Sequence, residues 1–430
     1  MNPFGIFLIV ATTLVPAYQL IMLPNIQDQA ALFSQYLGLA ALILMAWGQI
    51  MATRINGMET VFGGLDQIYV LHKWAGIVAL AAILLHDTID ADMEGIGVET
   101  TLSDIAETMG EISLYGLLVL VALSVATFVP YHLWKWTHKA MGALFAAGAF
   151  HFFFILKPFD MVDPAGLYTG VFCALGLLAY FWTLLPDQLR PSKTYKVTGL
   201  SQTGNALAIS MKPQSSPIKA EPGQFGILSF EGAGLGEPHP FSFSKIEEDG
   251  SLRVTAKALG DFTSKLDASL EIDQEVRIQG PFGRFRHSGN RPEVWIAGGI
   301  GITPFLAWAD ALSEESKEVE LFYCVRSLDD APHLEEIQEI AARKPNLTLH
   351  TIVSSNGERL TTERLVETIS APISEVGISF CGPVSLRQSL QKGLRRYGVS
   401  PRNFQYEEFE FRTGIGLKLL ARYALEKLER

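Results

Sequence analysis

The 430-residue chain has few cysteines and no concentration of basic residues. The three cysteines, Cys173, Cys324 and Cys381, are widely spaced, and this pattern matches neither a disulfide framework nor a zinc site. The net charge is -11 and no basic stripe is present, which argues against nucleic acid binding. The length allows two or three domains and excludes a mini-protein.

Charge is scarce in the first part of the chain. Residues 1–186 hold 5 Lys and Arg and 13 Asp and Glu, whereas residues 187–430 hold the remaining 29 basic and 32 acidic residues. About one position in ten is therefore charged in the first part and about one in four in the second, a contrast that separates membrane from soluble segments. We expect a membrane part followed by a water-soluble part.

Six apolar stretches lie in the first part, most of them near the roughly 20 residues that a helix needs to cross a membrane. They cover residues 4–23, 33–52, 69–86, 112–130, 134–156 and 165–185. The first stretch follows no basic residue and precedes no small-residue cleavage site, so it is predicted to be a span and not a signal peptide.

Loop charges predict the orientation of these spans. Basic residues lie at the ends of the second, fourth and sixth stretches: Arg54, Lys135, Lys139, Arg190, Lys193 and Lys196. Loop 87–111 has eight acidic residues and no Lys or Arg. The positive-inside rule then places the N-terminus and everything after residue 186 in the cytoplasm, and the acidic loop outside.

Histidine, which is rare in lipid, occurs in pairs in the third and fifth stretches. His72 and His86 are 14 residues apart and His138 and His151 are 13 apart, which corresponds to about 20 Å along a helix. Since both stretches run in the same direction, His72 and His138 share the inner level, and His86 and His151 the outer level. A single such histidine is more often a polar contact inside the bundle. Two facing pairs favour ligation of two haem irons.

The spacing of the second pair poses a geometric problem. Fourteen residues return to within about 40° of the same helix face, but thirteen miss it by about 140°. The fifth stretch is therefore expected to twist, bulge or kink, which Gly142 and Gly148 permit. Gly76 and Gly142 follow His72 and His138 by one turn, where a porphyrin needs room. Helix–helix packing explains these two glycines equally well.

The second part of the chain has the pattern of two soluble domains. Short alternating strands from residue 193 predict a small antiparallel β-barrel. After residue 292, strands alternate with helical runs, which predicts an α/β nucleotide-binding sheet. The predicted domains are residues 1–186, 191–288 and 290–430.

Two motifs in the barrel region suit a flavin nucleotide. Aromatic and hydroxyl side chains on a strand can hold a flat ring and bond its edge, although half-buried strand residues are the simpler explanation. Such residues are His239, Pro240, Phe241 and Ser242. A glycine and a threonine that enter a short helix can offer backbone N–H groups to a pyrophosphate. This second motif contains Lys257, Gly260 and Thr263.

A third motif follows an apolar strand and predicts a dinucleotide loop. Glycine allows close approach of the backbone to a ligand, and proline suits a first helical turn. The residues of this motif are Gly298, Gly299, Gly301, Thr303 and Pro304.

With these motifs in this order, the chain resembles the ferric reductase and NADPH oxidase superfamily, especially its bacterial members, over nearly its whole length. The resemblance implies a six-helix haem domain in the bacterial inner membrane, fused to a cytoplasmic ferredoxin–NADP reductase-like module. It assigns the motif that begins at His239 to the flavin ring, residues 279–283 to the end of the flavin barrel, and the loop from Gly298 to the nicotinamide nucleotide. It places Cys381, Gly382 and Pro383 beside the nicotinamide, and makes Ser242 and Cys381 the expected catalytic residues.

The resemblance also implies a route for electrons and an enzymatic activity. Hydride passes from NADPH or NADH to FAD, and single electrons pass through two b-type haems to ferric iron, another metal ion or dioxygen outside. Phe145 lies between the two histidine levels and is a candidate to assist this transfer, although core packing explains it at least as well. A haem and flavin subunit that serves a partner protein is the main alternative. A flavin reductase whose helices only anchor it is a further one.

The sequence departs from the oxidase branch in two places. Asp90 stands where those oxidases carry a further histidine, which weighs against superoxide production and, with the acidic loop, favours a metal cation as acceptor. The acids are equally explained as residues that keep an external loop solvated. The oxidases end on an aromatic residue near the flavin, whereas here 19 residues follow Phe411. Residues 415–430 are predicted to form a helix that packs on its own domain or lies at the membrane surface.

The choice of nicotinamide nucleotide rests on one position. Arg326 ends the second strand of the nucleotide domain, where an arginine favours the 2′-phosphate of NADPH and an acid the ribose hydroxyl of NADH. Asp329 and Asp330 follow closely, and Arg326 is equally explained as a solvated loop residue. The sequence thus leans towards NADPH.

Overall fold

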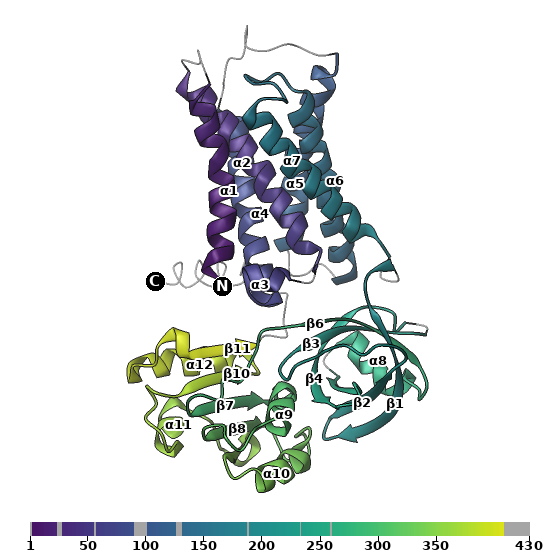
Figure 1. Cartoon of the computed structure of the whole chain (residues 1–430), viewed down its shortest axis with the longest axis vertical. Coiled ribbons are helices and arrows are strands. Elements are labelled where there is room, and N and C mark those ends of the chain that lie inside the picture. The colour runs from purple at the N-terminus through teal and green to yellow at the C-terminus, as the bar shows by residue number, and fades with distance from the viewer. Residues whose placement is uncertain are drawn as a thin grey trace, which may run out of the picture. The chain divides into compact units, whose positions relative to one another are not determined.

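The computed structural model describes residues 2–23, 28–55, 57–89, 101–125, 131–186, 189–232, 234–258 and 260–407. These residues form two compact units that divide near residue 187. The first unit is helical, and the second combines a barrel with an α/β sheet (Figure 1).

The first unit is a bundle of six long helices. They are α1 (Pro3–Ile21), α2 (Gln29–Ala52), α4 (Leu65–Thr88), α5 (Ser103–Val125), α6 (Tyr131–Phe154) and α7 (Pro164–Leu184), and a short helix α3 (Met58–Phe62) precedes α4. Within the described residues, α1, α2, α4, α5 and α7 are long and apolar enough to cross a membrane. The helix α6 has the length, but Lys135, Lys139 and its histidines make it less apolar.

The helix α2 is the most buried of the bundle, and it packs against α1, α4 and α7. Its start is fixed by Asp28, whose carboxylate accepts the backbone N–H groups of Ala30 and Ala31 at 2.8 and 3.2 Å. Phe145 of α6 is fully buried in the same core, in a cluster with Ala46 of α2 and Cys173 of α7. This position fits the core-packing explanation of Phe145.

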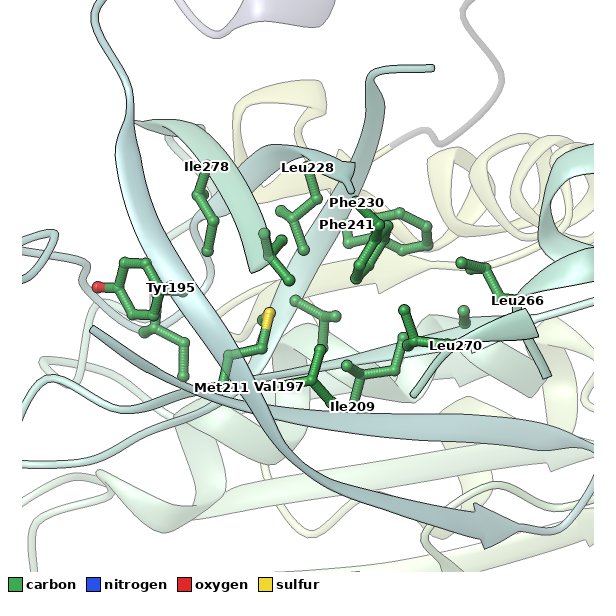
Figure 2. Close-up of a cluster of buried hydrophobic side chains, with 14 of the residues drawn as sticks. Tyr195, Val197, Ile209, Met211, Leu228, Phe230, Phe241, Leu266, Leu270 and Ile278 are labelled. Atoms are coloured by element: carbon green, nitrogen blue, oxygen red, sulfur yellow. The ribbon is translucent and has the colours of Figure 1, made fainter. Parts of the chain in front are cut away.

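The second unit begins with a closed antiparallel barrel in the strand order β1-β2-β5-β4-β3-β6. Its strands are β1 (Lys193–Thr203), β2 (Ala206–Pro213), β3 (Phe225–Phe230), β4 (His239–Ile246), β5 (Leu252–Lys257) and β6 (Glu275–Phe282), and α8 (Asp261–Ser269) follows β5. Alternate residues point inward, so that Val197, Ile209 and Leu228 meet in the barrel core (Figure 2). Closure leaves this sheet without free edges.

The chain continues into a parallel sheet in the order β11-β10-β7-β8-β9. Its strands are β7 (Glu293–Gly298), β8 (Val319–Val325), β9 (Leu347–Val353), β10 (Gly377–Cys381) and β11 (Phe404–Glu407). Helices cover both faces: α9 (Thr303–Asp310), α10 (Leu334–Arg343), α11 (Thr362–Thr368) and α12 (Val384–Leu394). Trp295 packs with α9 and α10 on one face, and Ile296 packs with α11 and α12 on the other.

The predicted fold class is confirmed: a helical membrane-type bundle, an antiparallel barrel and an α/β domain follow one another. The sheet has one strand, β11, beyond the four that the sequence pattern predicted. The strand order reverses between β7 and β10, and in open α/β sheets ligands bind at the carboxyl ends of the strands at such a point.

Candidate functional site

The four paired histidines lie on two helices of the bundle, His72 and His86 on α4, and His138 and His151 on α6. Each ring is held through Nδ1 by an oxygen atom of a neighbouring helix. The contacts are His72 with the Gly48 carbonyl at 3.0 Å, His86 with the Ser34 carbonyl at 2.8 Å, His138 with the Ser124 hydroxyl at 3.2 Å and His151 with the Ala106 carbonyl at 2.9 Å. A main-chain carbonyl can only accept a hydrogen bond, so a ring nitrogen bonded to one must carry a proton. The rings of His72, His86 and His151 therefore carry their proton on Nδ1.

The histidines of the inner pair meet: the ring centroids of His72 and His138 are 5.8 Å apart. His86 and His151 lie in the last turns of the same two helices. No group of three or more His, Cys, Asp or Glu side chains in the described part of the chain is arranged to hold a bare metal ion. The site is therefore built from two-histidine pairs.

These pairs fit haem iron. A histidine that ligates a metal through Nε2 usually donates its Nδ1–H to a carbonyl or another acceptor, which fixes the ring and its tautomer. The carbonyl contacts of His72, His86 and His151 leave Nε2 as the nitrogen with a free lone pair. Two such nitrogens that face each other at one level suit the axial positions of one haem.

The helices that carry the histidines pack mainly on other helices of the bundle. The helix α4 packs closely on α2, and α6 on α5, whereas α4 and α6 are not among the closely packed pairs. A Cβ atom at Gly76 would meet nothing within 4 Å, while one at Gly142 would collide with the ring of Tyr180. Gly76 thus fits the need of a porphyrin for space, and Gly142 fits helix packing.

The helix α6 is an uninterrupted α-helix over Tyr131–Phe154, so the expected bulge between its histidines is absent from these described residues. Thirteen residues place the two side chains about 140° apart around the helix axis. Both histidine side chains nevertheless form hydrogen bonds to α5. This is possible when the two side chains lie on either side of the α6 face that packs on α5. Their separation around the axis therefore requires no bulge.

In the second unit, three side chains converge where β4, β10 and β11 meet. The Ser242 hydroxyl of β4 donates to the Glu407 carboxylate of β11 at 3.3 Å. Cys381, the last residue of β10, is paired in register with Glu407 and is fully buried. Burial and the nearby Glu407 carboxylate raise the pKa of the Cys381 thiol well above its usual range, so the thiol stays neutral. The two residues expected to be catalytic thus share one acidic neighbour.

Glu407 was missed in the sequence because it lies in the short last strand, β11. The segment Phe404–Glu407 alternates aromatic and polar residues, but four residues are too few to predict a strand, and only the parallel pairing of β11 with β10 brings the carboxylate to Ser242. Position in the sequence was the signal that could have identified Glu407, because it is an acidic residue near the end of the α/β domain, after the Cys381 motif.

The motif on β4 divides between the core and the outside of the barrel. Phe241 points into the barrel core beside Phe230 (Figure 2), as the half-buried strand explanation has it. Pro240 and Ser242 alternate with it and face outward. His239 stacks on Phe262 of α8 at a centroid distance of 3.8 Å, which brings the two barrel motifs together. The Ser242 hydroxyl, which is buried on the outer side of the barrel against Glu407, suits the edge of a flavin ring.

The second barrel motif forms the start of α8. The Thr263 hydroxyl accepts the Gly260 N–H at 3.1 Å and donates to the Gly260 carbonyl at 3.2 Å. A Cβ atom at Gly260 would meet nothing within 4 Å. Lys257 ends β5, three residues earlier. This exposed helix start can offer N–H groups to a phosphate.

The dinucleotide loop follows β7 and packs against the residues after β10. A Cβ atom at Gly298 would lie 2.5 Å from Pro383, and one at Gly301 would collide with the Cys381 carbonyl, so close packing within the protein already requires these glycines. Gly382 meets Gly298 in the same way.

The remaining residues of the loop begin α9. Gly299 has a positive φ of 54° and no neighbour within 4 Å of a Cβ position, which makes it the glycine open to a ligand. Thr303 is buried and donates to the Ile300 carbonyl at 3.1 Å, and Pro304 occupies the first turn. The loop therefore combines an open glycine with a fixed helix start.

Arg326 is exposed directly after β8, and its carbonyl accepts the Ser355 N–H at 2.9 Å. The Asp330 carboxylate, by contrast, accepts a hydrogen bond from the side-chain amide of Asn205 of the barrel at 3.1 Å. Several sequence-based expectations lie outside the described residues: Asp90 with residues 91–100 of the acidic loop, the segment from Phe409, and the helix over 415–430.

Comparison with known proteins identifies the parts. Residues 37–149 match the family of ferric reductase-like transmembrane components, residues 191–302 an FAD-binding domain, and residues 295–392 an oxidoreductase NAD-binding domain. The toluate 1,2-dioxygenase electron transfer component of Pseudomonas putida is 28% identical over 215 residues, which cover 48% of this chain and 63% of that protein. A flavohemoprotein of Pseudomonas putida is 27% identical over 202 residues, which cover 45% of this chain and 52% of that protein.

The chain thus spans less than two thirds of the length of these curated relatives. Among solved structures, the flavohemoglobin from Malassezia yamatoensis with bound FAD and heme aligns over 92% of this chain and 99% of its own, with a TM-score of 0.51 and 18% identity. This likeness concerns the fold alone. A ferric reductase-like transmembrane component followed by FAD-binding and NAD-binding domains is a domain set consistent with the ferric reductase and NADPH oxidase superfamily.

Proposed function

We propose that the protein moves electrons from cytoplasmic NAD(P)H through FAD and two b-type haems to an acceptor on the other side of the membrane. The observation that carries the proposal is the double pairing of histidines between α4 and α6, with Nδ1 of each ring engaged. Flavin, when bound, links the two-electron chemistry of hydride to the one-electron chemistry of haem.

The residues of the chain have distinct parts in this proposal. His72 and His138 hold the inner haem, and His86 and His151 the outer one. In the reductase module, Ser242 and Glu407 position the flavin edge and the nicotinamide. The neutral thiol of Cys381 lines the site beside them and adds no charge. The open Gly299 admits the pyrophosphate of the nicotinamide nucleotide.

Ferric iron or another metal cation is the acceptor that we favour over dioxygen. Segment 87–111 follows the outer ligand His86 directly and includes the end of α4 and the start of α5. It contains eight acids and no base, which attracts cations. The alternative, a haem and flavin subunit that passes electrons to a partner protein, requires a docking partner on the outer side.

Electron transfer across a sealed membrane tests the proposal. We expect purified protein in liposomes, given NADPH outside, to reduce a membrane-impermeant ferric complex trapped inside, and His86→Ala to abolish this reduction while flavin reduction continues. Reduction of the trapped complex at the same rate by His86→Ala would refute the route through the outer pair.

A further inference from the structure

The four paired histidines differ in the kind of group that holds Nδ1. Three of them bond a main-chain carbonyl of a neighbouring helix: His72, His86 and His151. His138 differs, because the described partner of its Nδ1 is a side chain, the hydroxyl of Ser124 near the end of α5. A main-chain carbonyl is held in place by its helix and remains when the side chain is replaced. A side-chain hydroxyl is lost when its residue is replaced.

The ring of His138 is held at two places. Its Nδ1 contacts the Ser124 hydroxyl at 3.2 Å, and its face stacks on Trp134, one turn earlier on α6, at a centroid distance of 5.0 Å and an interplanar angle of 19°. Stacking restricts the tilt of the ring, and the hydroxyl restricts its rotation about the bond to the backbone. Together they fix the orientation of the His138 ring, whose centroid lies 5.8 Å from that of His72.

The acceptor at Nδ1 also has an electronic effect. An imidazole that donates its Nδ1–H becomes a more basic ligand, and hydrogen bonds beyond the ligands are one of the means by which proteins adjust haem potentials. A more basic ligand favours ferric over ferrous iron and so lowers the reduction potential. With the proton on Nδ1 and the lone pair on Nε2, the Ser124 hydroxyl acts as the acceptor.

We propose that Ser124 is a positioning residue that orients His138 and lowers the reduction potential of the inner haem. The inference rests on the proposed haem ligation by His72 and His138. It singles out the inner site as the one whose potential depends on a single mutable hydroxyl.

A matched pair of serine variants separates this role from packing. Ser124→Ala removes the described Nδ1 partner of His138. Ser34→Ala removes a hydroxyl that lies 2.9 Å from Nδ1 of His86, but the Ser34 carbonyl at 2.8 Å remains. Ser124→Thr keeps the hydroxyl at the inner site. Each variant of the full-length protein is titrated optically against a redox poise, and His72→Ala identifies the midpoint that belongs to the inner haem.

We expect Ser124→Ala to raise the inner midpoint potential alone, with a threefold to tenfold change in the ferric-to-ferrous ratio at fixed poise; tenfold corresponds to about 59 mV for one electron. Ser124→Thr restores the wild-type value, and Ser34→Ala changes neither midpoint. Loss of the inner haem from Ser124→Ala but not from Ser124→Thr also supports the role.

The inference is overturned if Ser124→Ala leaves both midpoints unchanged or shifts both. It is also overturned if Ser124→Thr behaves like Ser124→Ala or if Ser34→Ala causes an equal shift. Failure of the proposed function is distinguishable, because the wild-type protein would then lack two haems before any serine is changed.

Discussion

At the residue scale, the Glu407 carboxylate connects a barrel strand with the parallel sheet. Glu407 accepts from the Ser242 hydroxyl and lies beside Cys381, so a barrel strand and two strands of the parallel sheet meet at one polar contact. The thiol is held neutral by burial and by this carboxylate, as the raised pKa of Cys381 indicates. We therefore assign the polar contacts with flavin and nicotinamide to Ser242 and Glu407.

Removal of the Ser242 hydroxyl is expected to slow flavin reduction. Without it the reacting rings are less well positioned, and we expect Ser242→Ala to lower the rate of NAD(P)H-dependent flavin bleaching by about tenfold to a hundredfold in stopped-flow measurements. Ser244→Ala is the matched control, because Ser244 is also buried on β4 but bonds to the Arg253 carbonyl. Equal rates in the two variants would remove Ser242 from the site.

We expect Arg326 to decide the donor preference. We expect NADPH to have the higher kcat/KM, and Arg326→Ala to lower the NADPH value by roughly tenfold to a hundredfold, the scale of a lost charged hydrogen bond, with little effect on NADH. Steady-state kinetics with both nucleotides measures the ratio. A preference for NADH that Arg326→Ala leaves unchanged would contradict the lean towards NADPH.

At the scale of secondary-structure elements, a half-buried polar network joins the barrel to the α/β domain. Arg253 of β5 contacts Glu336 of α10 at 2.8 Å, and His333 contacts Glu336 at 2.7 Å and the Thr255 hydroxyl at 2.8 Å. Burial alone would raise the pKa of Glu336, but the hydrogen bonds from His333 and Arg253 outweigh it and lower the pKa to about 2. The network stabilises the contact between the two domains when Glu336 is ionised.

The pH dependence of this contact follows from the direction of the shift. A carboxyl whose pKa is lowered on folding stabilises the folded state above its unfolded value of 4.5, and this contribution is lost as the pH falls towards 2. At pH 7 we expect Glu336→Gln to destabilise the reductase module by about 1–3 kcal/mol. Thermal release of FAD fluorescence, compared with Glu339→Gln on the exposed side of α10, measures it. A difference from wild type that persists unchanged at pH 2 would contradict the ionic role.

The sequence predicted the elements well and their contacts less well. Apolar stretches and the strand patterns predicted the bundle, the barrel and the sheet, because they follow directly from the periodicity of burial. Short β11 and its Glu407 were missed, because pairing with β10, not local pattern, creates that strand. Gly76 and Gly142 were equivalent by spacing, and only the neighbouring Tyr180 distinguishes them.

At the scale of the whole molecule, the protein joins an FAD- and NAD-binding reductase module to a ferric reductase-like transmembrane part. Under the proposed function, the bilayer separates the electron donor from the acceptor. Most acids of the first part lie in segment 87–111, and we propose that their field around the end of α4 selects the outer acceptor.

The ionic-strength dependence of acceptor reduction tests that selection. We expect reduction of cationic ferric complexes to fall as salt rises, because salt screens the acidic loop, and reduction of dioxygen to stay nearly constant. Neutralising Asp87, Asp90, Asp92 and Glu94 together should lower the metal rate selectively. If cationic and anionic ferric complexes react equally well and the neutralised variant matches wild type, the loop does not choose the acceptor.

The haem content of the purified protein tests the central claim most directly. Reduced-minus-oxidised spectra and pyridine haemochrome analysis should give two low-spin b-type haems per chain in the wild type. His72→Ala and His138→Ala should lose the inner haem, and His86→Ala and His151→Ala the outer one, leaving one haem in each variant. A wild-type protein with one haem or none, or an unchanged haem content in all four variants, would contradict the account.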